Sequence, residues 1–85
     1  MNITVIGSHL CPDTLYVLNR LSEAKAEIDF KNLSASLSDL KAYLALRESD
    51  PVYADIRENG GIGIPCFILE DGTVTRDLET ALKSL

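Results

Sequence analysis

The sequence predicts an α/β protein with the element order β-α-β-α-β-β-α, in which a four-stranded mixed sheet has helices on both faces. Apolar, β-branched segments alternate with segments whose leucines recur at helical spacing. A strand, a helix and a second strand fit within about thirty residues, the length of a parallel crossover unit. The Asp71-Gly72 pair is a strong signal for a hairpin between antiparallel strands. The 85 residues leave room for one domain, 1–85, with a modest core.

The first half of the chain alternates strand and helix. Residues 2–6 are mostly β-branched and apolar, which predicts a strand buried on both faces. Pro12 suits the first turn of a helix that we expect to run to about residue 26. Its apolar face is predicted from three leucines at helical spacing: Leu15, Leu18 and Leu21. Residues 27–33 alternate apolar and polar side chains and predict the second strand.

A second helix is expected after the serine-rich break at residues 34–38. Ser38 would cap this helix, and Asp50-Pro51 would stop it. Residues 52–59 are expected to add a further helical turn or two before a cluster of glycines.

The last part of the chain reads as a hairpin followed by a helix. Residues 65–69 and 73–75 flank the Asp71-Gly72 turn and predict two antiparallel strands. Residues 76–85 carry leucines at helical spacing and predict a terminal helix. The mixed sheet follows from adding this hairpin to the parallel pair.

Composition and charge exclude several classes of function. The formal net charge of -5, with eight scattered basic residues, argues against a nucleic-acid or anionic-membrane surface. No apolar run approaches the roughly 20 residues that cross a bilayer, and the beginning "MNITVIGSHL" has no basic region before a long apolar core. Two cysteines and one histidine cannot build the usual four-ligand zinc site. We therefore expect a cytoplasmic protein without a metal site, whose cysteines are reduced thiols.

The segment Cys11-Pro12-Asp13-Thr14 places a cysteine where a strand gives way to a helix. The thiolate is the nucleophilic form of cysteine, and unpaired N–H groups at a helix N-terminus stabilise its negative charge. Cys11 is therefore the candidate nucleophile. Asp13, a like charge in the same turn, opposes this effect. His9 would support it if its protonated ring lay near the sulfur; otherwise it is a solvated loop residue.

Three segments in this order resemble the glutaredoxin branch of the thioredoxin fold: "HLCPDT" after the first strand, "GIGIPCFILEDG" in the second half, and a terminal helix starting near Arg76-Asp77. The resemblance spans nearly the whole chain and is greatest to small bacterial glutaredoxin-related proteins. It implies a thiol-disulfide oxidoreductase that serves cell redox homeostasis, with catalytic residues Cys11, Pro12 and Thr14. The basic residue that many glutaredoxins carry three positions before the cysteine is Ser8 here.

The resemblance also implies where a substrate binds. Pro65 is expected to follow a cis peptide bond, and the backbone of Ile64 would pair with the peptide backbone of glutathione or of a protein substrate. Asp77 best matches the acidic residue that meets the amino group of glutathione, although the glycine pair usual before it is missing. Arg76, or alternatively Arg57, would supply a cation for a carboxylate; as a plain alternative, each arginine is a solvated surface charge.

Thr14 occupies the position of the second cysteine of a dithiol site, which predicts a monothiol mechanism with glutathione or another low-molecular-weight thiol as co-substrate. The Thr14 hydroxyl is also suited to hydrogen-bond a thiolate. Cys66 is a candidate resolving thiol, because it follows the proline expected to face Cys11. The apolar residues that follow Cys66 favour the alternative, a cysteine packed as a small hydrophobe in a central strand.

Two other functions remain open from the sequence. One is an iron-sulfur carrier, because some single-cysteine glutaredoxins bridge a [2Fe-2S] cluster across a dimer; Pro12 disfavours it, since cluster-binding relatives usually have glycine there. The other is an interaction module that kept the fold and lost the chemistry. For the leading function we expect a monomer whose partners are glutathione or a disulfide-containing protein.

Overall fold

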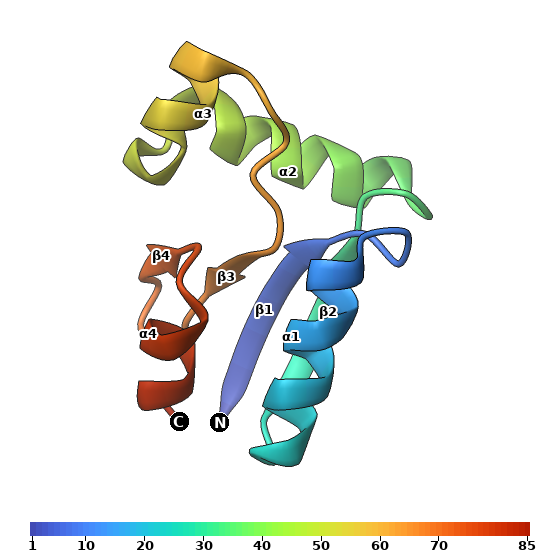
Figure 1. The fold of residues 1–85 in the computed structure, drawn as a ribbon, viewed down its shortest axis with the longest axis vertical. Coiled ribbons are helices and arrows are strands. Elements are labelled where there is room, and N and C mark those ends of the chain that lie inside the picture. The colour runs from blue at the N-terminus through green and yellow to red at the C-terminus, as the bar shows by residue number, and fades with distance from the viewer.

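The computed structural model describes residues 1–85 (Figure 1). The elements, in chain order, are β1 (Asn2–Gly7), α1 (Pro12–Glu23), β2 (Glu27–Asn32), α2 (Leu37–Ser49), the 3-10 helix η1 (Pro51–Tyr53), α3 (Ala54–Asn59), β3 (Cys66–Ile68), β4 (Val74–Thr75) and α4 (Leu78–Lys83). None of the helices is long and apolar enough to span a membrane.

The four strands form one mixed sheet in the order β2-β1-β3-β4. β1 runs parallel to β2 over its whole length and antiparallel to β3. In the antiparallel pair, Ile6 of β1 lies opposite Cys66 of β3. β3 and β4 form the antiparallel hairpin that the Asp71-Gly72 pair predicts, and Gly72 adopts a left-handed φ of 91° at the turn. The predicted class, an α/β protein with a four-stranded mixed sheet, is confirmed.

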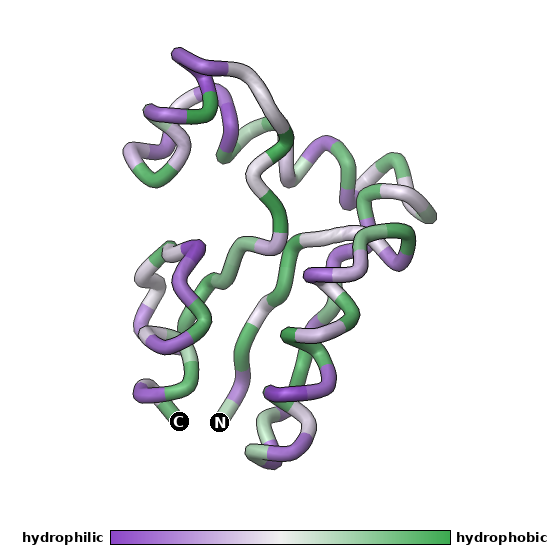
Figure 2. The backbone as a smooth tube through the Cα atoms, in the orientation of Figure 1, coloured by the Kyte–Doolittle hydropathy of each residue, from purple (hydrophilic) through white to green (hydrophobic).

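Helices cover both faces of this sheet, and each face has its own hydrophobic core. Because side chains alternate along a strand, Val5 and its partner Phe67 face one side, while Ile6 and Cys66 face the other. The first core packs α1 and α4 against the sheet, and its buried residues are Ile3, Val5, Val17, Leu21, Phe67, Leu69 and Ala81. The second core packs α2 and η1 against the other face, and its buried residues are Ile6, Tyr43, Tyr53 and Cys66. Apolar residues accordingly follow the central strands in Figure 2.

The predicted buried face of α1 is partly wrong. Leu15 is 51% exposed, whereas the buried residues of the helix are Thr14, Val17 and Leu21. Leu18 and Leu21 pack in the first core as predicted, and Leu15 does not. The sequence did not indicate Thr14 as a buried residue of this face, because a threonine does not look like a core residue. The helix also ends at Glu23 rather than near residue 26, since Lys25 adopts a left-handed φ of 62°.

The other helices differ from the prediction at their ends. α2 starts at Leu37, and its cap is Ser36 instead of Ser38, because the Ser36 hydroxyl accepts a hydrogen bond from the Asp39 N–H at 3.2 Å. The terminal helix is shorter than predicted because Asp77 caps it, which leaves Arg76 outside. The predicted extra turns before the glycines are present as η1 and α3.

Replacing Ser36 with alanine is expected to lower the free energy of unfolding by about 1 kcal/mol, the usual cost of losing an N-cap. Ser38→Ala is the matched control, because Ser38 is exposed within the first turn of the same helix and its side chain makes no hydrogen bond. Urea unfolding of both variants measures the difference. Equal losses for the two variants would contradict the assignment of the cap.

Candidate functional site

The candidate site lies where β1 leaves the sheet and β3 enters it. Ile6 pairs with Cys66, so the residues after Gly7 and the residues before Cys66 emerge at the same end of the sheet (Figure 1). Cys11 is in the first of these connections and Pro65 is in the second. The topology therefore brings together the two segments in which the sequence predicts the site.

Cys11 is the N-cap residue of α1, and Pro12 is the first helical residue. The Cys11 N–H donates to the Ser8 carbonyl at 3.0 Å, and the Cys11 carbonyl accepts from the Leu15 N–H at 3.2 Å. The Cys11 side chain makes no capping hydrogen bond and is partly exposed. The thiol is thus accessible beside a helix N-terminus, where unpaired N–H groups favour a negative charge.

Thr14 is completely buried and connects α1 to the end of β1. Its hydroxyl accepts a hydrogen bond from the Ser8 N–H at 3.3 Å. Its side chain also lies against Gly7, where an added Cβ would come within 2.5 Å of Thr14 Oγ1 and 2.6 Å of Thr14 Cγ2. Thr14 therefore holds the segment that leads to Cys11.

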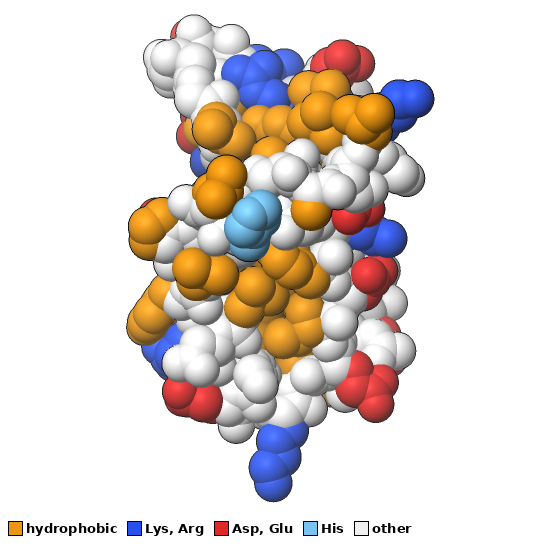
Figure 3. All heavy atoms as spheres, turned by 90° about the vertical axis from the view of Figure 1, so that its right-hand side faces the viewer, with side chains coloured by type: hydrophobic (Ala, Val, Ile, Leu, Met, Phe, Trp, Pro, Cys, Tyr) orange, Lys and Arg blue, Asp and Glu red, His pale blue; other side chains and the backbone are white.

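The connection from β1 to α1 is also attached to the residues that follow β2. The Ser8 hydroxyl is hydrogen-bonded to the Ser34 hydroxyl. His9 Nδ1 lies 2.9 Å from Asn32 Nδ2, and the His9 N–H donates to Asn32 Oδ1 at 3.5 Å. His9 is an exposed loop residue that contacts Asn32, as the plainer of the two sequence interpretations expected; Figure 3 shows the single histidine on the surface, with hydrophobic side chains above and below it.

The connection that leads into β3, residues 60–65, is called the proline loop below. The Ile64-Pro65 peptide bond is cis, as predicted. Neither the N–H nor the carbonyl of Ile64 makes a hydrogen bond within the chain, and Ile64 is partly exposed. These two backbone groups are free to pair with an extended peptide.

Two tyrosines in contact with the proline loop were not identified from the sequence as site residues. The Tyr43 hydroxyl donates to the Ile62 carbonyl at 2.5 Å, and the Tyr53 hydroxyl donates to the Gly63 carbonyl at 2.8 Å. A usable signal was present, since a buried tyrosine needs a partner for its hydroxyl and a glycine-rich loop offers unpaired carbonyls. The sequence could not show that these groups meet.

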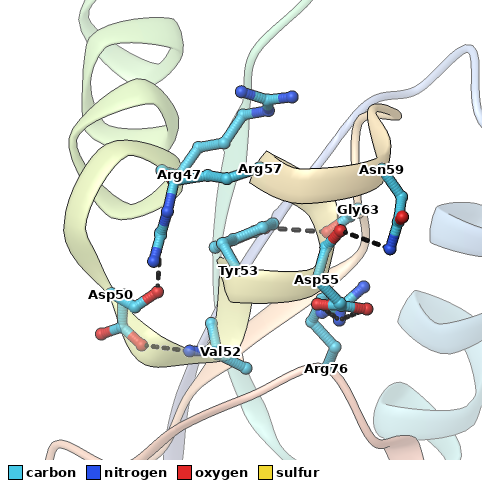
Figure 4. Close-up of polar contacts among 9 residues, drawn as sticks. All are labelled: Arg47, Asp50, Val52, Tyr53, Asp55, Arg57, Asn59, Gly63 and Arg76. Atoms are coloured by element: carbon cyan, nitrogen blue, oxygen red, sulfur yellow. Dashed lines mark hydrogen bonds and ion pairs between the residues drawn. The ribbon is translucent and has the colours of Figure 1, made fainter.

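The two arginines predicted to bind a substrate carboxylate, Arg76 and Arg57, interact with other groups of the chain (Figure 4). Arg76 forms an ion pair with Asp55, with N···O distances of 2.6 and 2.8 Å, and its guanidinium lies 5.5 Å from the centre of the Tyr53 ring. This pairing holds the pKa of Asp55 below its usual value. Arg57 donates to the carbonyls of Arg47 and Asp50 at 2.8 and 2.9 Å. Arg76 is therefore not a free surface charge, whereas Arg57 is exposed and has hydrogen bonds but no ion pair.

Asp77, the predicted partner of an amino group, caps α4. Its carboxylate accepts hydrogen bonds from the Thr80 hydroxyl at 2.6 Å and the Thr80 N–H at 3.1 Å. These bonds to Thr80 lower the pKa of Asp77. The carboxylate therefore remains charged, but it is already hydrogen-bonded as the N-cap of α4.

Cys66 is fully buried in the second core, on the face of the sheet opposite α1. Burial raises the pKa of its thiol. Both cysteines are free. This position matches the core-residue interpretation of Cys66 and directs its sulfur away from the helix that Cys11 caps. The chain has no cluster of three or more His, Cys, Asp or Glu side chains that could hold a metal ion.

Comparison with known proteins gives one informative relative. An uncharacterized protein of Haemophilus influenzae is 34% identical over 68 residues, which covers 80% of this chain and 79% of the relative. No protein-family model matches the chain, and no solved structure matches it.

Gly7→Ala is expected to destabilise the protein by about 1–3 kcal/mol, the usual cost of overpacking, because the new Cβ meets the Thr14 side chain. A double-mutant cycle with Thr14→Ala, followed by urea unfolding, tests the cause. The cost of Gly7→Ala should fall sharply in the Thr14→Ala background, where the obstructing atoms are gone. An equal cost in both backgrounds would show that Gly7 is needed for another reason.

The raised pKa of Cys66 predicts a loss of stability at alkaline pH. An unfolded cysteine titrates at about pH 8.5, so the folded protein holds this proton more tightly. The resulting stabilisation is complete below that pH and is lost as the pH rises toward the folded pKa. Between about pH 8 and 9.5, below the usual tyrosine range, the free energy of unfolding should fall less steeply in Cys66→Ala than in the wild type. Identical slopes would argue against this assignment.

Proposed function

The chain belongs to the same family as the uncharacterized Haemophilus influenzae protein, and we propose that it is a glutaredoxin-type thiol-disulfide oxidoreductase with a thioredoxin-like fold. Its nucleophile is Cys11, and its mechanism uses one thiol. A single observation carries the proposal: an accessible cysteine caps α1 at the same end of the sheet as Ile64, whose backbone groups are unpaired.

The arrangement of the strands supports the thioredoxin-like assignment. The sheet order β2-β1-β3-β4, with β1 and β2 parallel and the terminal hairpin antiparallel, is the order that this fold requires. The helix that Cys11 opens and α4 share one face of the sheet, and α2 covers the other.

The proposed reaction begins with attack by the Cys11 thiolate on a mixed disulfide between glutathione and a substrate thiol. A bond forms between Cys11 Sγ and the glutathione sulfur, the original S–S bond breaks, and the substrate leaves as a thiolate that takes a proton from solvent. A second glutathione thiolate then attacks the Cys11 disulfide, which yields oxidised glutathione and restores Cys11. Glutathione is the reductant, and the substrate disulfide is reduced by two electrons.

The lack of a second nearby thiol supports the monothiol route. Thr14 occupies the position of a resolving cysteine, and the Cys66 sulfur faces the opposite core. Release of the intermediate therefore requires a thiol from solution. Another low-molecular-weight thiol can replace glutathione in both steps with the same balance.

The charges around the site bear on this choice of thiol. A glutathione carboxylate would have to compete with Asp55 for Arg76, and the amino group would have to share Asp77 with Thr80. A small thiol without carboxylate or amino groups would need neither Arg76 nor Asp77. We propose that the protein acts as a cytoplasmic monomer on glutathione or such a thiol, and on disulfide-containing proteins.

The test is the intact mass of the reduced protein after exposure to oxidised glutathione and an acid quench. We expect a gain of one glutathione, lost in Cys11→Ser and retained in Cys66→Ser, which is the matched control because it removes the other thiol. Repeating the exposure with a disulfide of an uncharged thiol compares the two classes of co-substrate.

Two results would contradict the proposal. Loss of two hydrogens, abolished by either substitution, would mean that Cys66 resolves the intermediate through a rearranged structure. No adduct with either disulfide, under conditions that modify a control thiol, would exclude the oxidoreductase and favour an interaction module.

A further inference from the structure

The carbonyl groups of three consecutive residues in the proline loop are held by side chains from the helices behind it. Arg47 donates to the Gly61 carbonyl at 3.1 Å, Tyr43 to the Ile62 carbonyl and Tyr53 to the Gly63 carbonyl. The next residue is Ile64, whose own backbone groups are unpaired. The three carbonyls before Ile64 are thus bonded to side chains, whereas both the N–H and the carbonyl of Ile64 are unpaired.

The two tyrosine hydroxyls are fixed by the second core and not by the loop. The Tyr53 ring is fully buried and the Tyr43 ring is nearly so. The rings meet edge to face, with centroids 6.0 Å apart at 87°, and the Arg76 guanidinium lies over Tyr53. Figure 4 shows the Tyr53 hydroxyl directed at the Gly63 carbonyl. The packing of the rings fixes each hydroxyl relative to the sheet. The hydrogen bond then fixes the loop carbonyl that the hydroxyl binds.

The loop lies directly on the Tyr53 ring. Gly63 has a left-handed φ of 72°, and a Cβ added there would come within 2.7 Å of Tyr53 Cε1 and 2.9 Å of Ile56 Cγ1. Burial raises the pKa of both tyrosines above the usual value of about 10. Both hydroxyls therefore remain protonated donors at neutral pH.

Satisfying the loop carbonyls does not by itself require tyrosine. Ile62 is 56% exposed, and water can bond to carbonyls at such a surface. Unlike water, the tyrosine hydroxyls are attached to buried rings, and they therefore fix the direction of two successive peptide groups. That direction determines how the next residue, Ile64, presents its N–H and carbonyl.

We propose that Tyr43 and Tyr53 are positioning residues for substrate: their hydroxyls orient the proline loop so that the backbone of Ile64 can pair with the peptide backbone of a disulfide substrate. This inference rests on the proposed oxidoreductase function. The tyrosines act on the binding of a peptide and not on the reactivity of Cys11, since their contacts are with the loop and the second core.

The experiment compares Tyr43→Phe and Tyr53→Phe with the wild type. Each variant keeps the ring and removes one hydroxyl. Tyr16→Phe is the matched control, because the Tyr16 hydroxyl accepts a bond from Arg20 on the exposed side of α1, away from the proline loop. Four quantities are measured: the rate of Cys11 alkylation by iodoacetamide, kcat and KM for a mixed disulfide of glutathione with a fluorescent cysteine peptide, and the free energy of unfolding in urea.

We expect the KM for the peptide disulfide to rise about threefold to tenfold in each loop variant, the effect of one lost hydrogen bond. Cys11 alkylation and kcat should stay close to the wild-type values, and Tyr16→Phe should change neither constant. Backbone ¹⁵N relaxation gives a second readout that needs no turnover. The order parameter of Ile64 should fall in both loop variants and not in the control.

Different results separate the failure of the inference from the failure of the function. No turnover by the wild type would overturn the oxidoreductase itself, and with it the positioning role. Wild-type turnover with an unchanged KM in both loop variants would overturn only the positioning role, even if both variants lost stability. Unchanged order at Ile64 would overturn it as well. A parallel fall in alkylation rate would show that the tyrosines act on Cys11 instead.

Discussion

The pairing of Ile6 with Cys66 is the contact on which the geometry of this protein depends. It fixes the antiparallel register of the two central strands and therefore brings the start of α1 and the proline loop to one end of the sheet. A shift of one residue would exchange the two faces of β3, so that Cys66 would enter the first core and Phe67 the second. The two separate cores resist such a shift, because Phe67 and Cys66 are each completely buried among different neighbours.

Much of this fold follows from local patterns in the sequence. Local backbone preferences suffice to predict three features: the strand at the β-branched run of β1, the turn at Asp71-Gly72 and the end of α2 at Asp50-Pro51. The structure contains all three. The ends of the helices were harder to predict, because a cap depends on which of several serines or aspartates lies in position to accept an N–H. Ser36 and Asp77 show this at α2 and α4.

The candidate site was predictable only in part. The positions of Cys11 and Pro65 follow from the order of the elements, but the surroundings of the charged residues do not. Arg76 and Arg57 could be read from the sequence as free cations, yet each finds acceptors on a segment that is distant along the chain or at a helix end. The roles of Thr14 and of the two loop tyrosines likewise depend on contacts across the fold, which no spacing in the sequence encodes.

The two edge strands of the sheet, β2 and β4, have features that limit pairing with another chain. An exposed edge strand is a template for uncontrolled pairing with another chain, and proteins restrain it by making the strand short or charged. β4 has two residues, and β2 carries Glu27, Asp29 and Lys31 in alternation, with an ion pair of 3.4 Å between the last two. An extended chain would therefore pair poorly with either edge strand. The backbone groups of Ile64, in contrast, are unpaired. If the proposed function holds, the sheet edges limit pairing between copies of the protein, and the proline loop receives the peptide.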